Sequence, residues 1–263
     1  MPQASAITRW EEFYGSTEVV RRYARQAHLQ VPERVIFDTV IGDAALAQAT
    51  MLDLGVGGGR TTMQLARRCL RYVGADYAEP MVQACRARFG DLMAHHGLRF
   101  DVVDARDMPY EDATFDVVLF SFNGIDLVGA DARAKALAEC RRVLKPGGHL
   151  VYSSHNLNWM DSRRGIRWEG LRDYVQTQRF WTRMRRLNHA VWPIAPREWV
   201  ELTDPLAGGC NYYLRPRELV RQTLAQGFAS VRLFDLQGRQ FDAAPQQAAI
   251  SDPWVYLHAR ASR

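Results

Sequence analysis

The sequence has few cysteines and no long apolar run, and these two absences limit the kinds of protein it can be. Its four cysteines, at positions 69, 85, 140 and 210, form no Cys-x-x-Cys pair, so neither a disulfide framework nor a metal site is predicted. No stretch reaches the ~20 apolar residues that cross a bilayer, and the start of the chain lacks the apolar core of a signal peptide. We expect a cytoplasmic protein with free thiols and no membrane segment.

Internal repeats, low-complexity tracts and a strong charge of one sign are also missing. The 263 residues carry 34 basic and 29 acidic side chains, which give a formal charge of +5 and a pI near 9.2. This modest excess admits a nucleic-acid or acidic partner without requiring one. With 47% apolar residues, the chain can bury a full core as one large domain with an elaboration.

Apolar runs and helical patterns alternate from residue 50 onward. The runs predict strands at about 50–54, 71–75, 98–103, 115–120 and 148–154. Between them, residues 79–93 and 131–144 place apolar side chains at helical spacing, and the KPGG that follows is expected to end the second helix. This alternation is typical of a mainly parallel sheet covered by helices.

The rest of the chain divides around that alternating core. Residues 1–49 predict two or three helices that cover the sheet, and residues 155–213 break the rhythm and are interpreted as an inserted lid or substrate segment. A helix at 215–226 and strands at 229–236 and 254–261 then return to the sheet. The core is therefore expected over residues 50–154 and 214–263.

Four glycines lie within the five positions 55–59, between the first strand and the helical pattern that follows. A helix N-terminus presents unpaired backbone N–H groups and a partial positive charge, so an anionic group can sit there if no side chain blocks it. The other interpretation is a tight turn that binds nothing, because one glycine-rich turn is a weak signal.

Three nearby residues point to a ligand and to its chemistry. Asp53 precedes the glycines and would repel a pyrophosphate but attract an ammonium group. Arg60 stands where a dinucleotide-binding loop has its third glycine. Asp76 ends the second strand, where it can accept hydrogen bonds from ribose hydroxyls. Together they indicate a nucleoside with an amino-acid-like tail.

With these residues and the motifs around them, the sequence resembles the class I S-adenosylmethionine-dependent methyltransferases. The resemblance is carried by LDLGVGGGRTT, VGADYAEPMV, DVVDARDMPYEDATFDVVLF and CRRVLKPGGHLVYSS. It covers about residues 45–155 and resumes near 215–261. It implies S-adenosyl-L-methionine as cofactor and an α/β Rossmann-like fold with a seven-stranded sheet in the order 3-2-1-4-5-7-6, strand 7 being antiparallel.

The resemblance also assigns residues to the cofactor. The glycines and Asp53 would shape the pocket for the methionine tail, Asp76 would hold the ribose, and Asp104 would meet the adenine. The full set of expected cofactor residues is Asp53, Gly55, Val56, Gly57, Gly59, Asp76, Tyr77, Met81, Asp104, Ala105 and Ser121. Structural roles stay open for three of them: Asp53 as a backbone cap, Asp104 as a helix cap or turn residue, and Tyr77 as a packing residue.

The acceptor of an in-line methyl transfer should lie beyond the carboxyl ends of the strands, beside the cofactor. His155 could serve there as a general base or could be hydrogen-bonded for structure. Asn123 could orient the acceptor or could form a turn. Tyr14 and Arg163 are further candidates for substrate contacts.

The segment from Arg163 to Arg186 holds eight arginines, interleaved with aromatic residues, against Glu169 and Asp173. Such a segment could hold an anionic or aromatic substrate. It could equally be a solvated face, or the subunit interface of a homo-oligomer.

We therefore expect a methyltransferase that acts on a nitrogen or oxygen atom of a small molecule, with carbon less favoured, in specialised metabolism. The fourth strand lacks the Asn/Asp-Pro-Pro-Tyr pattern of methyltransferases that modify nucleic-acid bases. An RNA methyltransferase is the alternative that the pI and the arginines support, and a non-catalytic module that binds S-adenosylmethionine is a second. Neither the acceptor atom nor the substrate can be read from the sequence.

Overall fold

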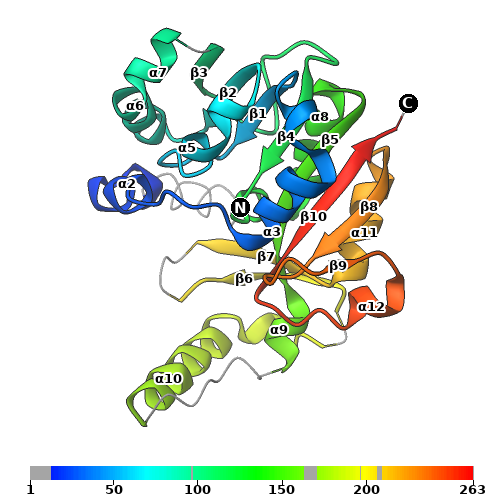
Figure 1. The fold of residues 1–263 in the computed structure, drawn as a ribbon. Helices are drawn as coiled ribbons and strands as arrows, with labels where there is room; N and C mark the ends of the chain where they lie inside the picture. Colours follow the sequence, from blue (N-terminus) through cyan, green and yellow to red (C-terminus); the bar gives the residue numbers. More distant parts are fainter. Residues whose placement is uncertain (1–12, 96, 163–170, 196, 206–208, 263) are drawn as a thin grey trace.

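The computed structural model describes residues 13–95, 97–162, 171–195, 197–205 and 209–262, which fold around one sheet with helices on both faces (Figure 1). The central path of the sheet runs β3-β2-β1-β4-β5-β10-β8-β9. In chain order these strands are β1 (Thr50–Leu54), β2 (Arg71–Asp76), β3 (Gly97–Val102), β4 (Phe115–Phe120), β5 (Leu144–Asn156), β8 (Phe228–Phe234), β9 (Gln240–Phe241) and β10 (Trp254–Ala261).

The order of the seven core strands confirms the expected one. Strands β1 to β5 pair in parallel, and β10 lies antiparallel between β5 and β8. The number of strands differs from the expected seven, because the sheet has ten. Besides β9, the additions are β6 (Trp199–Thr203) and β7 (Cys210–Leu214), an antiparallel hairpin.

This hairpin lies within residues 155–213, the segment that the sequence predicts as an inserted lid or substrate segment. Strand β5 continues through Asn156, and β7 pairs in parallel with its last two residues, His155 opposite Tyr213. The segment thus extends the sheet at the carboxyl end of β5. Side chains alternate between the two faces of a strand, and in this hairpin Val200 and Leu202 of β6 share an apolar face with Tyr213 of β7. This shared face explains why β6 pairs with β7.

Two helical layers cover the sheet. One face carries α3 (Val31–Val35), the π-helix η1 (Ile36–Ile41), α4 (Asp43–Leu46), α5 (Thr62–Leu65), the 3₁₀ turn η2 (Ala66–Arg68) and α6 (Glu79–Arg88). The other face carries the 3₁₀ turn η3 (Gly124–Leu127), α8 (Ala130–Val143) and α11 (Pro216–Ala225), with α12 (Ala244–Ala248) beside α11. Their apolar faces fill the core on either side of β4 and β5, as the helical spacing predicts.

Two details differ from the predicted helices. The helix expected over residues 79–93 is divided at Phe89 into α6 and α7 (Gly90–His95). The KPGG after α8 belongs to β5 rather than to a turn, with Gly147 at φ +76°. Among the described residues, no helix is long and apolar enough to cross a membrane.

The rest of the 155–213 segment builds a small core of its own. It contains α9 (Leu157–Ser162), α10 (Leu171–Leu187) and the 3₁₀ turn η4 (His189–Val191). Met160 and Met184 pack with Ile194 and with the hairpin. Figure 1 shows α10 at the periphery, beyond the hairpin and away from the parallel strands. The arginines of α10 therefore lie apart from the strand ends of β1 and β2.

Candidate cofactor and acceptor site

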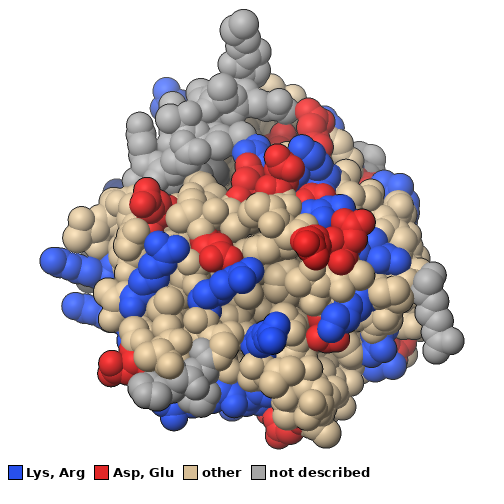
Figure 2. Space-filling view, turned by 90° about the horizontal axis from the view of Figure 1, so that it is seen from above, with Lys and Arg blue, Asp and Glu red and all other residues tan. Residues whose placement is uncertain are grey.

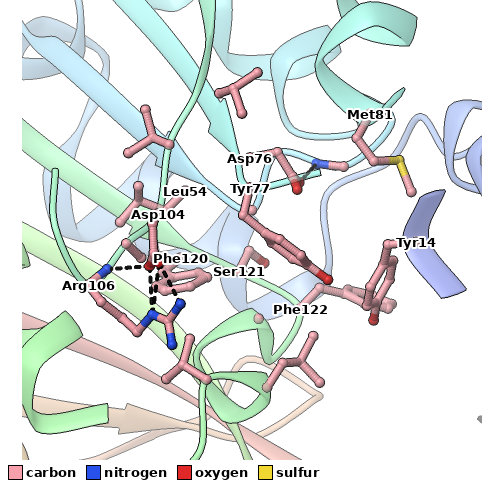
Figure 3. Close-up of a pocket in the computed structure, with 18 of the residues that line it drawn as sticks. Tyr14, Leu54, Asp76, Tyr77, Met81, Asp104, Arg106, Phe120, Ser121 and Phe122 are labelled. Atoms are coloured by element: carbon pink, nitrogen blue, oxygen red, sulfur yellow. Dashed lines mark hydrogen bonds and ion pairs between the residues drawn. The ribbon is translucent and has the colours of Figure 1, made fainter. Parts of the chain in front are cut away.

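A cavity of about 350 Å³ opens at the carboxyl ends of β1, β2 and β4 (Figure 3). Its lining comes from these strands, the end of β3, the loops and helices that follow them, and the N-terminal segment that includes Tyr14 and helix α2 (Thr17–Ala24). The lining residues are Tyr14, Tyr23, Leu54, Gly55, Gly57, Asp76, Tyr77, Met81, Val102, Val103, Asp104, Ala105, Arg106, Phe120, Ser121, Phe122, Gly124, Leu127 and Val128. Eight of the expected cofactor residues border it, namely Gly55, Gly57, Asp76, Tyr77, Met81, Asp104, Ala105 and Ser121.

The glycine loop serves two different purposes. Gly55 and Gly57 border the cavity with φ of +63° and +53°, a conformation that favours glycine. Gly58 faces the protein itself, because a Cβ there would lie 2.3 Å from the backbone nitrogen of Ala24. A Cβ at Gly59 would lie 2.3 Å from the ring of Phe89. Gly59, which the sequence assigned to the cofactor, makes room for Phe89, and Gly58, which was not assigned, makes room for α2.

Asp76 lies between the glycine loop and the cavity. Its Oδ2 accepts a hydrogen bond from the Gly57 N–H and its Oδ1 one from the Ala78 N–H, each at 2.9 Å. Burial raises the pKa of this carboxyl, which the backbone N–H groups oppose. Each carboxylate oxygen keeps a further lone pair, so Asp76 can still accept bonds from two vicinal hydroxyls.

Asp53 does not border the cavity. It accepts hydrogen bonds from the hydroxyls of Thr61 and Tyr72, and burial raises its pKa to about 6. It therefore ties β1 and β2 to the end of the glycine loop. Val56 and Gly59, expected beside the cofactor, also lie outside the lining.

Asp104 borders the cavity and also forms a turn. Its Oδ1 accepts from the Arg106 N–H at 2.8 Å, and its carboxylate faces the guanidinium at 2.6–2.9 Å (Figure 3). The Arg106 side chain lowers the pKa of Asp104. Arg106 itself was not foreseen, although its spacing of two from Asp104 is the signal that could have found it.

Ser121 belongs to a buried polar cluster that joins four parts of the chain. Arg60 of the glycine loop makes two bonds to Glu33 of α3, at 2.6 and 2.7 Å. Ser121 donates to Glu33 and accepts from Arg60 at 3.1 Å. The hydroxyl of Tyr256, on β10, lies 3.2 Å from that of Ser121. The cluster holds the helical cover against the cavity wall, and sequence reasoning missed it.

Of the residues expected to act on the acceptor, only some border the cavity. Tyr14 borders the cavity, whereas Asn123 and His155 do not, and Arg163 lies outside the described residues. Asn123, at φ +61°, donates its N–H to Ser153 at 2.8 Å and forms the turn after β4.

His155 faces a carboxylate. Its Nδ1 lies 2.8 Å from Oδ2 of Asp126, which is fully buried on η3. The buried guanidinium of Arg133 pairs with the other oxygen of Asp126. The carboxylate of Asp126 thus holds the imidazole of His155 in one orientation.

Replacing Gly58 with alanine is expected to weaken binding of S-adenosylhomocysteine about tenfold, a loss of ~1.4 kcal/mol. The new methyl group would meet the α2 backbone, which cannot move aside without carrying Tyr23 away from the cavity. Calorimetric titration measures the change. Gly90→Ala is the matched control, because a Cβ there meets nothing within 4 Å. Equal affinities for the two variants would contradict the role of the α2 contact.

Comparison with known proteins agrees with this geometry. Residues 51–148 match a family model described as a methyltransferase domain. A demethylmenaquinone methyltransferase of Clavibacter sepedonicus is 37% identical over 108 residues, which are 41% of this chain and 42% of that protein. A ubiquinone/menaquinone biosynthesis C-methyltransferase of Desulfotalea psychrophila is 34% identical over 110 residues, 42% of each. The match thus spans about two fifths of the length of these relatives.

The fold match covers much more of the chain than these sequence matches do. The crystal structure of a 1,6-didemethyltoxoflavin-N1-methyltransferase from Burkholderia thailandensis, with 1,6-didemethyltoxoflavin and S-adenosylhomocysteine bound, matches at a TM-score of 0.60 and 15% identity. It covers 99% of this chain and 89% of that one. Residues 51–148 thus match a methyltransferase domain, and the described residues share the Rossmann-like α/β fold of that crystal structure.

Proposed function

We propose that this chain transfers the methyl group of S-adenosylmethionine to a small planar acceptor. The observation that carries the proposal is one cavity bordered by two kinds of residue. In Figure 3, Asp104 and Arg106 lie on one side of it, and the aromatic rings of Tyr14 and Phe122 lie on the other. The first side suits a nucleoside, and the second suits an apolar ring.

The cofactor would occupy the glycine and aspartate side. Asp76 would hold the ribose hydroxyls, and Asp104, Ala105 and Arg106 would border the adenine. Gly55 and Gly57 would leave room for the methionine tail, with Ser121 near its sulfonium end. When bound, the cofactor supplies a methyl group on a positively charged sulfur, and the protein has to aim the acceptor at it and exclude water.

The relatives shift the choice of acceptor atom. The expectation from sequence favoured nitrogen or oxygen, whereas the names of the two curated relatives describe methylation in quinone biosynthesis, one of them at carbon. The Burkholderia enzyme methylates a nitrogen of a fused heterocycle. These acceptors share a flat ring, so we place a quinol-type carbon first and a ring nitrogen or oxygen second.

His155 would accept the proton that such an acceptor releases. Asp126 fixes its Nδ1 and so aims Nε2. His155 and Tyr213 have ring centroids 4.8 Å apart, which places the imidazole at the join between β5 and the hairpin. In this proposal the acceptor lies between the cavity and that join.

An RNA acceptor has less support. Figure 2 shows acidic and basic side chains interspersed over the described part of one face, without the continuous basic tract that a nucleic-acid backbone favours. Helix α10 is rich in arginine and could contact RNA, but it lies away from the ends of β1 and β2.

The decisive experiment offers labelled S-adenosylmethionine with a naphthoquinol, a phenol, an aromatic amine and a transcript of mixed sequence. We expect S-adenosylhomocysteine to bind and the label to appear on a ring acceptor, with binding that changes little with salt. Label on the RNA, with affinity that falls steeply as salt rises, would overturn the proposal. Cofactor binding without any methylated product would instead support a non-catalytic module.

A further inference from the structure

The turn that follows β4 has an unusual backbone. Phe122 and Asn123 both adopt positive φ, of +56° and +61°. Asparagine tolerates this conformation, but a bulky aromatic residue rarely adopts it. Strained residues of this kind concentrate at ligand sites, where the fold holds a side chain in one place.

The ring of Phe122 is held in place and yet exposed. The guanidinium of Arg60 lies 5.2 Å from its centroid, and the ring of Trp254 lies 6.1 Å away at 49°. Arg60 is itself fixed by Glu33. Phe122 nevertheless leaves 38% of its surface exposed and borders the cavity. A ring supported from behind and open in front is a surface on which another ring can stack.

Polar atoms beside this ring lack partners. Among the described residues, Oδ1 of Asn123 and Nε1 of Trp254 are buried without a hydrogen bond. Buried polar atoms are nearly always paired. Neither Asn123 nor Trp254 lines the cavity, so the inference rests on the ring of Phe122 and not on these two atoms.

We propose that Phe122 is the platform on which the planar ring of the methyl acceptor stacks, and that it makes the site specific for flat rings. The inference rests on the proposed function, because it names the acceptor's place in that site. Phe122 follows Ser121 directly, so a ring stacked on it would lie beside the expected sulfonium end of the cofactor.

Phe122→Gly tests this assignment with little risk to the fold, because glycine adopts the observed backbone without strain. We expect kcat/KM for the aromatic acceptor to fall about 30-fold, mainly through KM, as loss of a stacked ring contact predicts. The affinity for S-adenosylhomocysteine should stay within about twofold. Phe122→Tyr restores an aromatic ring, so its kcat/KM should lie well above that of Phe122→Gly, and the thermal midpoint of each variant reports whether it folds.

A second readout separates this inference from the proposed function. Calorimetry follows the binding of 2-hydroxy-1,4-naphthoquinone to protein saturated with S-adenosylhomocysteine, and cyclohexane-1,4-dione is the non-aromatic control. Ring binding that Phe122→Gly abolishes supports the platform even if no methyl transfer is detected. Equal binding by wild type and variant overturns it. Loss of cofactor affinity in the variant would also overturn it, because Phe122 would then belong to the cofactor's share of the cavity.

Discussion

Asp76→Ala is expected to weaken binding of S-adenosylhomocysteine by at least about 100-fold, because a carboxylate that holds two hydroxyls contributes roughly 1.5–3 kcal/mol per bond. The change also leaves the N–H groups of Gly57 and Ala78 without their acceptor. The glycine loop would then lose the contact that sets its position beside the cavity. Calorimetric titration of the purified variant gives the affinity directly.

Two variants make this result specific. Asp76→Asn keeps one acceptor oxygen for a loop N–H and loses the charge, so its affinity should lie between those of wild type and Asp76→Ala. Asp101→Ala removes a carboxylate from the neighbouring strand β3 that does not border the cavity, and it should bind as wild type does. An Asp76→Ala protein with wild-type affinity would refute the assignment of the ribose to this side chain.

Glu33→Ala is expected to lower the free energy of unfolding by about 3–5 kcal/mol, the usual result of leaving one member of a buried ion pair alone. Glu33 is fully buried and Arg60 is 8% exposed. The variant also deprives the hydroxyls of Ser121 and Tyr256 of a shared acceptor. Urea denaturation measures the loss.

The matched control removes both charges. Glu33→Met combined with Arg60→Met leaves no buried charge unpaired, so it should be more stable than Glu33→Ala. If the double variant is the less stable of the two, the instability comes from lost packing rather than from the isolated guanidinium. Because Arg60 also supports Phe122, the double variant should still use an aromatic acceptor poorly.

The core strands could be predicted because most of them are short, mainly apolar runs between turn residues. Strands β1, β4 and β10 begin and end where those runs do. The hairpin β6–β7 could not be predicted in the same way. Its strands are short, and Trp199 and Tyr212 stack on one another as a cross-strand pair, a contact that has no local signal in either strand.

The candidate site likewise contains residues that could be predicted from the sequence and residues that could not. Asp76 and Asp104 follow strands whose ends must meet at one edge of the sheet, so their place beside the cavity follows from topology. Glu33 and Arg60 are separated by 27 residues, and each taken alone is typical of a solvated helix or loop. Asp126 was missed for a similar reason, because only the fold brings it to His155.

Because Gly58 has no side chain, the glycine loop packs directly against the backbone of α2. Any motion that opens one must disturb the other, so their opening equilibria are linked. A nucleoside that tightens the loop should slow amide exchange in α2, and a protease cut near α2 should hasten release of the nucleoside. Amide exchange in α2 would then report whether the cavity is occupied.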